Sequence, residues 1–128
     1  MPWQAMRDTG IPAAVGKLVL ARDCHACVCC GKSVTAEMGA IYFRKPERLG
    51  GPATPENLIT VLRTCGERIS FQRDPQDEAR GYRLRSWHDP ALVPVALTLG
   101  TGPRATVWLT RYGLLSFEPP PGDEDVPA

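Results

Sequence analysis

The chain has 128 residues and a mass of 14.0 kDa, enough for one domain, and its content of 43% hydrophobic and 23% charged residues is ordinary for a globular protein. Its longest apolar runs cover only a few residues, and no basic stretch followed by an apolar one opens the chain. We therefore expect neither a membrane protein nor an exported one, and predict a cytoplasmic location. The formal net charge is +1, but residues 1–85 carry 13 basic and nine acidic side chains, a bias that permits a nucleic-acid partner without requiring one.

The first part of the chain predicts a helix, a tight turn and a strand. Proline suits the first helical position because its missing N–H would be unpaired there, so a helix is expected from about Pro12 to Arg22. The apolar residues at helical spacing are Ile11, Val15, Leu18 and Val19. Residues Asp23 to Gly31 are short and rich in cysteine, and predict a hairpin of the zinc-knuckle kind. Residues Ala36 to Arg44 have the β-branched and aromatic content of a strand.

The middle of the chain predicts a loop and then a second helix. Residues Lys45 to Thr54 contain two prolines and a glycine pair, which favours a loop. Thr54 as N-cap and Pro55 at the first helical position predict a helix start. One face of that helix would carry the apolar residues Leu58, Val61, Leu62, Cys65 and Ile69.

The C-terminal part predicts a short helix followed by an antiparallel β-meander. Asp74 and Pro75 begin the helix and Gly81 ends it. Three short strands are expected at residues 92–99, 105–110 and 114–117, joined by turns at 100–103 and 111–113. We expect the aromatic residues of this part to pack in its core and not to form a base-stacking platform: Trp87, Trp108, Tyr112 and Phe117. Residues 119–128 are acidic and rich in proline, and predict a disordered tail.

Cysteine is the most informative residue type. The five cysteines are Cys24, Cys27, Cys29, Cys30 and Cys65. An odd number without an export signal argues against a disulfide framework and for reduced thiols or metal ligation. The C-x-x-C pair of Cys27 and Cys30 places two thiolates on a tight turn, from which both can reach one tetrahedral zinc at about 2.3 Å. One such pair supplies half a site, and no second pair follows it.

Three segments follow one another in a specific order: ARDCHACVCCG before a strand, then the loop LGGPATPENL, then ITVLRTC. Over residues 10–69 this order resembles the HNH nuclease family, in the form common in actinobacterial and phage genomes. The best matches are Arg22-Asp23, Cys27, Cys30-Gly31, Gly50-Gly51 and Pro55-Glu56-Asn57-Leu58. The resemblance implies an α+β fold. Its N-terminal helix and degenerate ββα-metal unit would occupy residues 1–72, with the short helix and meander at 73–118 packed on them.

The resemblance also implies that the chemistry of the family is absent. In the family, a strand residue and the following histidine lie over the scissile phosphate, where the histidine is the general base and a divalent ion stabilises the leaving oxygen. The ungapped alignment puts Tyr42 and Phe43 at these positions, and a phenyl ring can neither accept a proton nor bind a metal. A two-residue gap puts Gly39 and Ala40 there instead. Asn57 matches the family residue that supports the histidine loop, whereas the last metal ligand falls on Gly66. We therefore expect no catalytic divalent metal.

The structural zinc of the family is altered in this sequence. The second cysteine pair of the family falls on Leu62 and Cys65. Cys27, Cys30 and Cys65 together could still bind a structural zinc. The candidates for the fourth ligand are Cys24, Cys29, His25 or water. In the opposite interpretation the metal is lost, and the cysteines pack as small buried hydrophobes.

The expected function is that of a catalytically inactive HNH-like protein, of a kind found in phages and mobile elements. It would bind double-stranded DNA or dock on a DNA-processing protein as a regulator or inhibitor, with no small-molecule substrate. The predicted phosphate contacts are Arg44, Lys45, Arg48, Arg63 and Arg68. One alternative is an active metal-dependent endonuclease with relocated ligands such as Glu37, Glu47 or His88. Another is a protein-interaction module without nucleic-acid affinity.

Overall fold

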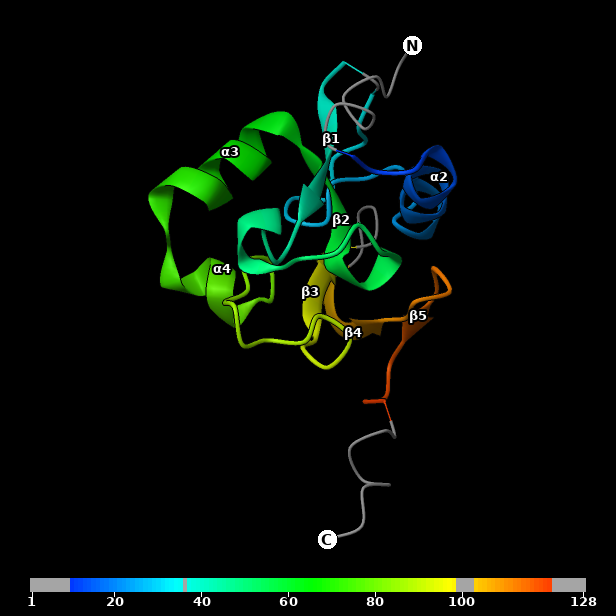
Figure 1. Ribbon diagram of the computed structural model, residues 1–128. Coiled ribbons are helices and arrows are strands. Elements are labelled where there is room, and N and C mark those ends of the chain that lie inside the picture. The colour runs from blue at the N-terminus through cyan, green and yellow to red at the C-terminus, as the bar shows by residue number, and fades with distance from the viewer. Residues whose placement is uncertain (1–9, 36, 99–102, 121–128) are drawn as a thin grey trace, which may run out of the picture.

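The computed structural model describes residues 10–35, 37–98 and 103–120, which form an α+β fold with two small antiparallel sheets (Figure 1). The elements in chain order are α2 (Ala13–Arg22), β1 (Gly39–Phe43), η1 (Glu47–Leu49), η2 (Pro55–Asn57), β2 (Leu58–Leu62), α3 (Arg63–Gln72), α4 (Pro75–Ala79), β3 (Val95–Thr98), β4 (Arg104–Leu109) and β5 (Leu115–Ser116). No helix in the described part of the chain is long and apolar enough to cross a membrane.

The first sheet pairs β1 with β2 and lies between two helices. Tyr42 is opposite Ile59 and Phe43 is opposite Leu58. All five residues of β2 are buried. Leu58 packs in one apolar cluster with residues of α2, whereas Ile59 packs in the other cluster with Ile69 of α3. Successive side chains of a strand face opposite ways, so the two helices cover opposite faces of β2.

The second sheet is the predicted meander, with strand order β3-β4-β5. Val95 and Leu97 on β3 are buried and alternate with half-buried residues, as expected for a sheet with one covered face. Both residues belong to the same apolar cluster as Ile59 of the first sheet. The described residues before and after position 72 thus contribute to one shared apolar cluster.

The cysteine-rich segment connects the two sheets. The N–H of Val28 donates to the carbonyl of Thr60 on β2 at 2.9 Å, and its carbonyl accepts from the N–H of Thr98 on β3 at 3.1 Å. The Tyr82 hydroxyl donates to the carbonyl of Ala96 on β3 at 2.6 Å. Because Val28 lies between strands of different sheets, the position of the cysteine turn is fixed from both sides.

The predicted helix starting at Thr54 is wrong over its first half. Residues Pro55–Asn57 form a 3-10 turn, Leu58–Leu62 form strand β2, and the helix begins only at Arg63. A strand that is buried on both faces has no polar alternation, so its apolar residues can match helical spacing by chance. The β-branched run Ile59-Thr60-Val61 favours the extended conformation that the structure shows.

The other predicted elements are confirmed within a few residues. Helix α2 begins after Pro12, and β1 lies inside the predicted strand at 36–44. Asp74 caps α4 by accepting a hydrogen bond from the N–H of Gln76. The predictions for the turn at 100–103 and for the tail at 119–128 fall largely on residues 99–102 and 121–128, which lie outside the described residues, as do residues 1–9 and 36.

Three aromatic residues that we expected in the C-terminal core are on the surface. Trp87 is 72% exposed, and Tyr112 and Phe117 are each 66% exposed. Trp108 on β4 is half-buried. Trp87 lies in the irregular segment between α4 and β3 and not on a strand, so the alternation that buries side chains in the meander does not apply to it. The core prediction is wrong for these three residues.

Candidate functional site

The cysteine turn begins directly after α2. Cys24 and His25 adopt left-handed φ angles of 58° and 52°, which reverse the chain at the end of the helix. The N–H of Cys27 donates to the carbonyl of Lys32 at 2.8 Å, and the N–H of Gly31 donates to the carbonyl of Cys27 at 2.7 Å. Gly31 has a φ of 81°, which favours glycine at the tip of this tight hairpin. The predicted tight hairpin is therefore present.

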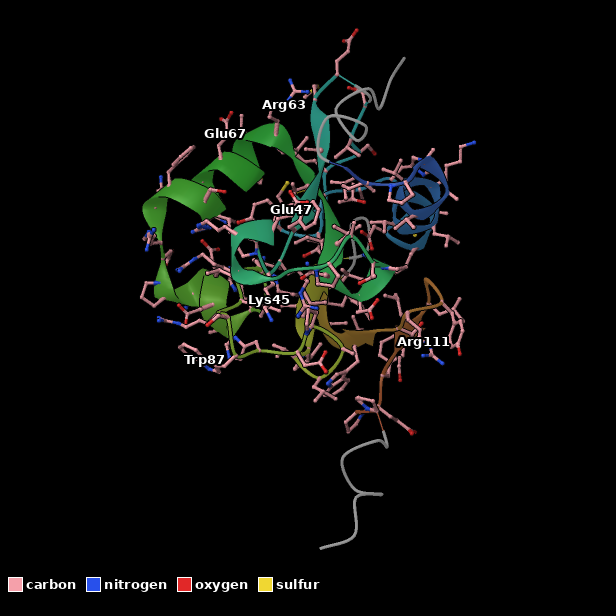
Figure 2. All side chains as sticks on the ribbon, viewed as in Figure 1. Lys45, Glu47, Arg63, Glu67, Trp87 and Arg111 are labelled. Atoms are coloured by element: carbon pink, nitrogen blue, oxygen red, sulfur yellow. The ribbon has the colours of Figure 1, made fainter. Side chains whose placement is uncertain are left out.

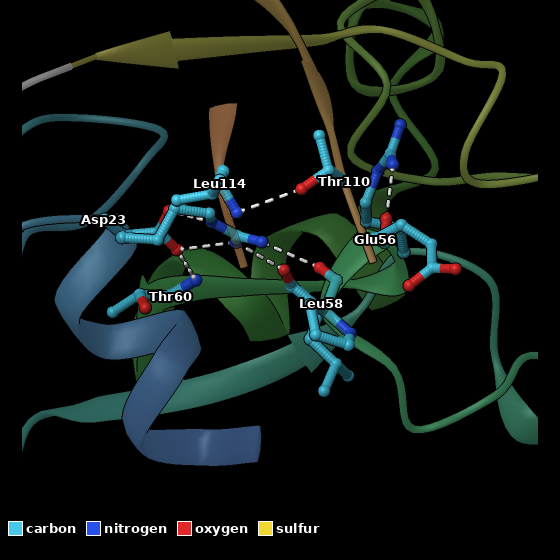
Figure 3. A network of polar contacts seen from close by, with 9 residues as sticks. Asp23, Glu56, Leu58, Thr60, Thr110 and Leu114 are labelled. Atoms are coloured by element: carbon cyan, nitrogen blue, oxygen red, sulfur yellow. Dashed lines mark hydrogen bonds and ion pairs between the residues drawn. The ribbon is translucent and has the colours of Figure 1, made fainter. Parts of the chain in front are cut away.

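A buried ion pair anchors this turn to β2. The Arg22 guanidinium donates to the Asp23 carboxylate at 2.8 and 3.0 Å, and the same carboxylate accepts from the N–H of Thr60 at 2.9 Å. Figure 3 shows Asp23 beside Thr60, joined by a dashed line. Arg22 also donates to the carbonyls of Pro55 and Leu58. Because every partner is on or next to β2, the cysteine hairpin has a fixed position relative to that strand.

Three of the cysteines converge from two elements. The Sγ atoms of Cys27, Cys30 and Cys65 all lie within 4.8 Å of one another. Three sulfurs around one tetrahedral zinc stand about 3.8 Å apart when each Zn–S bond is about 2.3 Å, so small side-chain rotations suffice to bind a metal ion. Cys65 lies in the first turn of α3. The cluster can hold a metal ion such as zinc.

The environment of Cys27 suits a metal ligand. The thiol of Cys29 and the backbone N–H groups of Leu62, Cys30 and Cys29 donate hydrogen bonds to its sulfur, and together they lower the pKa of Cys27 to about 4 despite its burial. The pKa of Cys29 is raised because its proton is held in the hydrogen bond to Cys27. Burial, with the nearby charge of Cys27, raises the pKa of Cys65 to about 12. A bound cation would offset this repulsion between thiolates.

The residues predicted as fourth ligands lie at different places relative to the three-cysteine cluster. Neither Cys24 nor His25 contributes an atom to the cluster, and both are exposed in the left-handed turn. Neither residue is therefore placed to share a metal ion with the three clustered sulfurs. The thiol of Cys29 lies close to Cys27 and is hydrogen-bonded to the Cys27 sulfur. Leu62, which the resemblance aligns with a cysteine, packs in the apolar core with 9% of its surface exposed.

Arg44 is not a phosphate contact, because its side chain is fully buried. The guanidinium donates to four carbonyl groups at 2.6 to 3.0 Å, those of Gly81, Glu56, Pro90 and Val93. Burial, with a smaller contribution from Arg22, lowers the pKa of Arg44 to about 9, so the group still carries its charge at neutral pH. Arg44 fastens the segment between α4 and β3 to the end of β1.

Asn57 holds the loop between the strands of the first sheet. Its Oδ1 accepts from the N–H of Lys45 at 2.8 Å, and its Nδ2 donates to the carbonyls of Lys45 and Pro52 at 2.9 Å. A Cβ at Gly51 would lie 1.7 Å from the Lys45 carbonyl oxygen, so only glycine fits there. The loop at 45–52 thus depends on one asparagine and one glycine.

The other predicted phosphate contacts do not form one surface. Lys45 is half-buried and its Nζ donates to the carbonyl of His88 at 3.0 Å. Arg68 pairs with the buried carboxylate of Asp77 at 2.8 and 3.1 Å. Arg48 and Arg63 are exposed, but Figure 2 shows Arg63 beside the start of α3, away from Lys45 and Trp87. Only Arg48 of the five predicted residues lines the groove that we describe next.

A groove of about 740 Å³ lies between β1, α3 and the segment after α4. Tyr42 and Phe43 of β1 are half-buried in its wall. Phe71 comes from α3, and Trp87 comes from the segment between α4 and β3. Figure 2 shows Trp87 at the edge of the molecule near α4. Four guanidinium groups also line this groove, those of Arg48, Arg73, Arg83 and Arg85.

The lining of the groove contains no carboxylate and no histidine. The relocated catalytic residues considered above do not converge on it. Glu37 is exposed before β1, and the His88 Nδ1 accepts a hydrogen bond from the N–H of Arg85 at 2.9 Å in a turn. In the part of the chain that the structure describes, the cysteine cluster is the only set of three or more His, Cys, Asp or Glu residues close enough to share a metal ion.

The sequence analysis did not identify most of the residues that line the groove as functional. The segment Arg83-Leu84-Arg85-Ser86-Trp87 places two arginines and a tryptophan within five residues, and this local basic cluster is the signal that could have indicated one wall of the groove. Phe71 and Arg73 gave no such signal, because they look like an ordinary helix end.

Comparison of the chain with family models, with curated proteins and with solved structures finds no match.

Proposed function

We propose that this protein is a non-catalytic, HNH-like module that binds nucleic acid through the groove. The observation that carries the proposal is the composition of its lining, which combines four arginines and four aromatic side chains without a carboxylate or a histidine. Guanidinium groups bind phosphates in a bidentate manner, and aromatic rings offer faces to bases. The same lining lacks a group that could activate water, so binding without cleavage is the expected activity.

The charge of the groove supports a polyanionic ligand. Glu78 pairs with Arg85 at 2.9 and 3.0 Å and with Arg83 at 3.4 Å. Within the described residues, Arg48 and Arg73 form no ion pair. One carboxylate against four guanidinium groups leaves three positive charges around the opening, which suits a phosphate backbone.

The arrangement of the first sheet supports the HNH-like assignment. The antiparallel strands β1 and β2 are followed without a break by α3, which gives the order strand, strand, helix of a ββα unit. Asn57 closes the loop between the strands, and the groove opens beside Tyr42 and Phe43, where the resemblance places the catalytic pair.

We propose that the metal of the cysteine cluster is a structural zinc held by Cys27, Cys30 and Cys65, with Cys29 or water as the fourth ligand. Zinc would cross-link the cysteine hairpin to the first turn of α3. Since α3 also carries Phe71, this cross-link would fix one wall of the groove.

Nucleic-acid binding is tested by fluorescence anisotropy with labelled single-stranded and duplex DNA over a range of salt concentrations. We expect binding that weakens with salt, and a lower affinity with a smaller salt slope for the double variant Arg48→Glu/Arg73→Glu. Arg111→Glu is the matched control, because Arg111 is exposed on the opposite side of the view in Figure 2. Absence of binding at low salt, or equal losses in both variants, would contradict the proposal.

The absence of cleavage is tested by incubating plasmid DNA with the protein and Mg²⁺, Mn²⁺, Ni²⁺ or Zn²⁺. We expect the plasmid to stay intact in every case. Cleavage that Asn57→Ala abolishes would overturn the non-catalytic part of the proposal and favour an active nuclease.

A further inference from the structure

We infer that the groove takes single-stranded nucleic acid, with unpaired bases stacked on Trp87 and Phe71. This inference rests on the proposed function, and it names the form of nucleic acid that the site prefers. The sequence pattern instead led us to expect double-stranded DNA as the partner.

Two large aromatic side chains are presented to solvent at the groove. Phe71 is 81% exposed and Trp87 is 72% exposed, the two highest values among the large apolar residues of the described chain. Neither ring packs in the two apolar clusters of the fold. Both line the same hollow, one from α3 and one from the segment after α4. Two rings that contribute nothing to the core, facing one hollow, form a surface suited to flat apolar ligands.

The Trp87 ring is held by its neighbours. The guanidinium carbon of Arg85 lies over the ring, 5.6 Å from its centroid, and the His88 ring stands 5.7 Å away at 54°. The Arg85 guanidinium itself is fixed by two hydrogen bonds to Glu78. A side chain that is ordered while exposed loses less conformational entropy when a base stacks on it.

The chemistry around these rings matches a single strand better than a duplex. Base faces are covered by neighbouring pairs in a duplex, so an exposed tryptophan has no face to stack on there. In a single strand the faces are free, and non-specific single-strand sites combine stacking aromatics with a cationic path for the backbone. A hollow of about 740 Å³ is within the size range of small-ligand sites, so it has room for a few unpaired bases.

The experiment compares two labelled probes of equal length, oligo-dT and a mixed-sequence duplex, in fluorescence anisotropy titrations. We expect the single strand to bind more tightly than the duplex. Trp87→Ala and Phe71→Ala should each weaken single-strand binding by about 5- to 150-fold, with little change for the duplex, since one stacked base contributes that factor. Trp87→Phe should recover most of the loss.

The matched controls are Tyr112→Ala and Phe117→Ala, which remove equally exposed aromatic rings outside the groove. Arg111 lies over the Tyr112 ring at 5.0 Å, so this pair repeats the Arg85 and Trp87 arrangement elsewhere on the surface. Circular dichroism and thermal melting of each variant should match the parent protein, because all four rings are exposed.

The outcomes separate this inference from the proposed function. A duplex bound as tightly as the single strand, or groove variants that behave like Tyr112→Ala, overturns the single-strand inference and leaves nucleic-acid binding in place. Failure to bind either probe overturns both. Competition by free thymidine monophosphate as strong as that by oligo-dT at equal nucleotide concentration would show a mononucleotide site, and would also overturn the inference.

Discussion

The two sheets are stabilised in different ways. Around β1 and β2, buried polar groups connect the chain in addition to the apolar packing: the Arg22–Asp23 ion pair, Arg44 with its four carbonyl partners, and Asn57 in the strand-connecting loop. In β3 and β4, buried apolar residues alternate with more exposed ones in the usual pattern of a half-covered sheet. Loss of a buried polar group leaves its partners unsatisfied, whereas loss of an apolar group leaves a cavity. The first sheet should therefore be the more sensitive one to single substitutions.

The largest effect is expected at Arg44. Replacement by Met would leave four carbonyl groups, two buried and two partly buried, without this donor, and should destabilise the fold by about 5 kcal/mol or prevent folding. Urea unfolding followed by circular dichroism measures this change. Arg48→Met is the matched control, since Arg48 is exposed and should change stability by less than about 0.5 kcal/mol. Equal stability of the two variants would remove the distinction between the sheets.

The next effect is expected from metal removal. If zinc is present at a thousand times its dissociation constant, it stabilises the fold by about 4 kcal/mol, so a strong chelator should lower the melting temperature markedly. Cys65→Ser should lower both the zinc content and this chelator effect. Cys24→Ser, outside the cluster, should change neither. A purified protein without zinc whose melting temperature is insensitive to added zinc would refute the proposed metal site.

A smaller effect is expected in the core under the second sheet. Leu97 is fully buried, so Leu97→Ala should cost about 3 kcal/mol through lost burial and the cavity that it leaves. The urea midpoint should fall while the slope of the unfolding transition stays constant. A loss as large as that of Arg44→Met would mean that the two sheets are equally sensitive.

The smallest effect is expected for the hydroxyl that joins Tyr82 to β3. Tyr82→Phe keeps the buried ring but removes the hydrogen bond to the carbonyl of Ala96, and should cost about 1 kcal/mol. The difference is measurable by thermal melting. A cost above that of Leu97→Ala would show that polar connections dominate the second sheet as well.

The sequence predicted the elements whose patterns are local. The strands of the meander were found from the turn residues that separate them, and α4 was found from its capping aspartate and following proline. Strand β2 was missed because both of its faces are buried, which removes the alternation. Whether a residue such as Ile59 faces one helix or another depends on tertiary packing, which spacing along the chain does not contain.

In the candidate site, too, residues with a local sequence pattern were predicted, whereas residues whose role depends on tertiary contacts were not. Cys27 and Cys30 were found from their spacing, and Cys65 from the family resemblance, and the three lie together. Arg44 was misassigned because an arginine in a basic loop looks solvated until its carbonyl partners are known. Trp87 was misassigned because an aromatic residue near predicted strands usually belongs to a core. Burial of a charge and exposure of an aromatic ring both depend on contacts that are distant in sequence.

The most direct test of binding through the groove is photocrosslinking. Oligo-dT carrying 5-iododeoxyuridine is bound to the protein and irradiated, and the crosslinked peptides are identified by mass spectrometry. We predict adducts on Trp87, Phe71 or Tyr42, three of the four aromatic residues that line the groove. Adducts confined to Tyr112 or Phe117, or no adduct although the oligonucleotide is bound, would contradict the account.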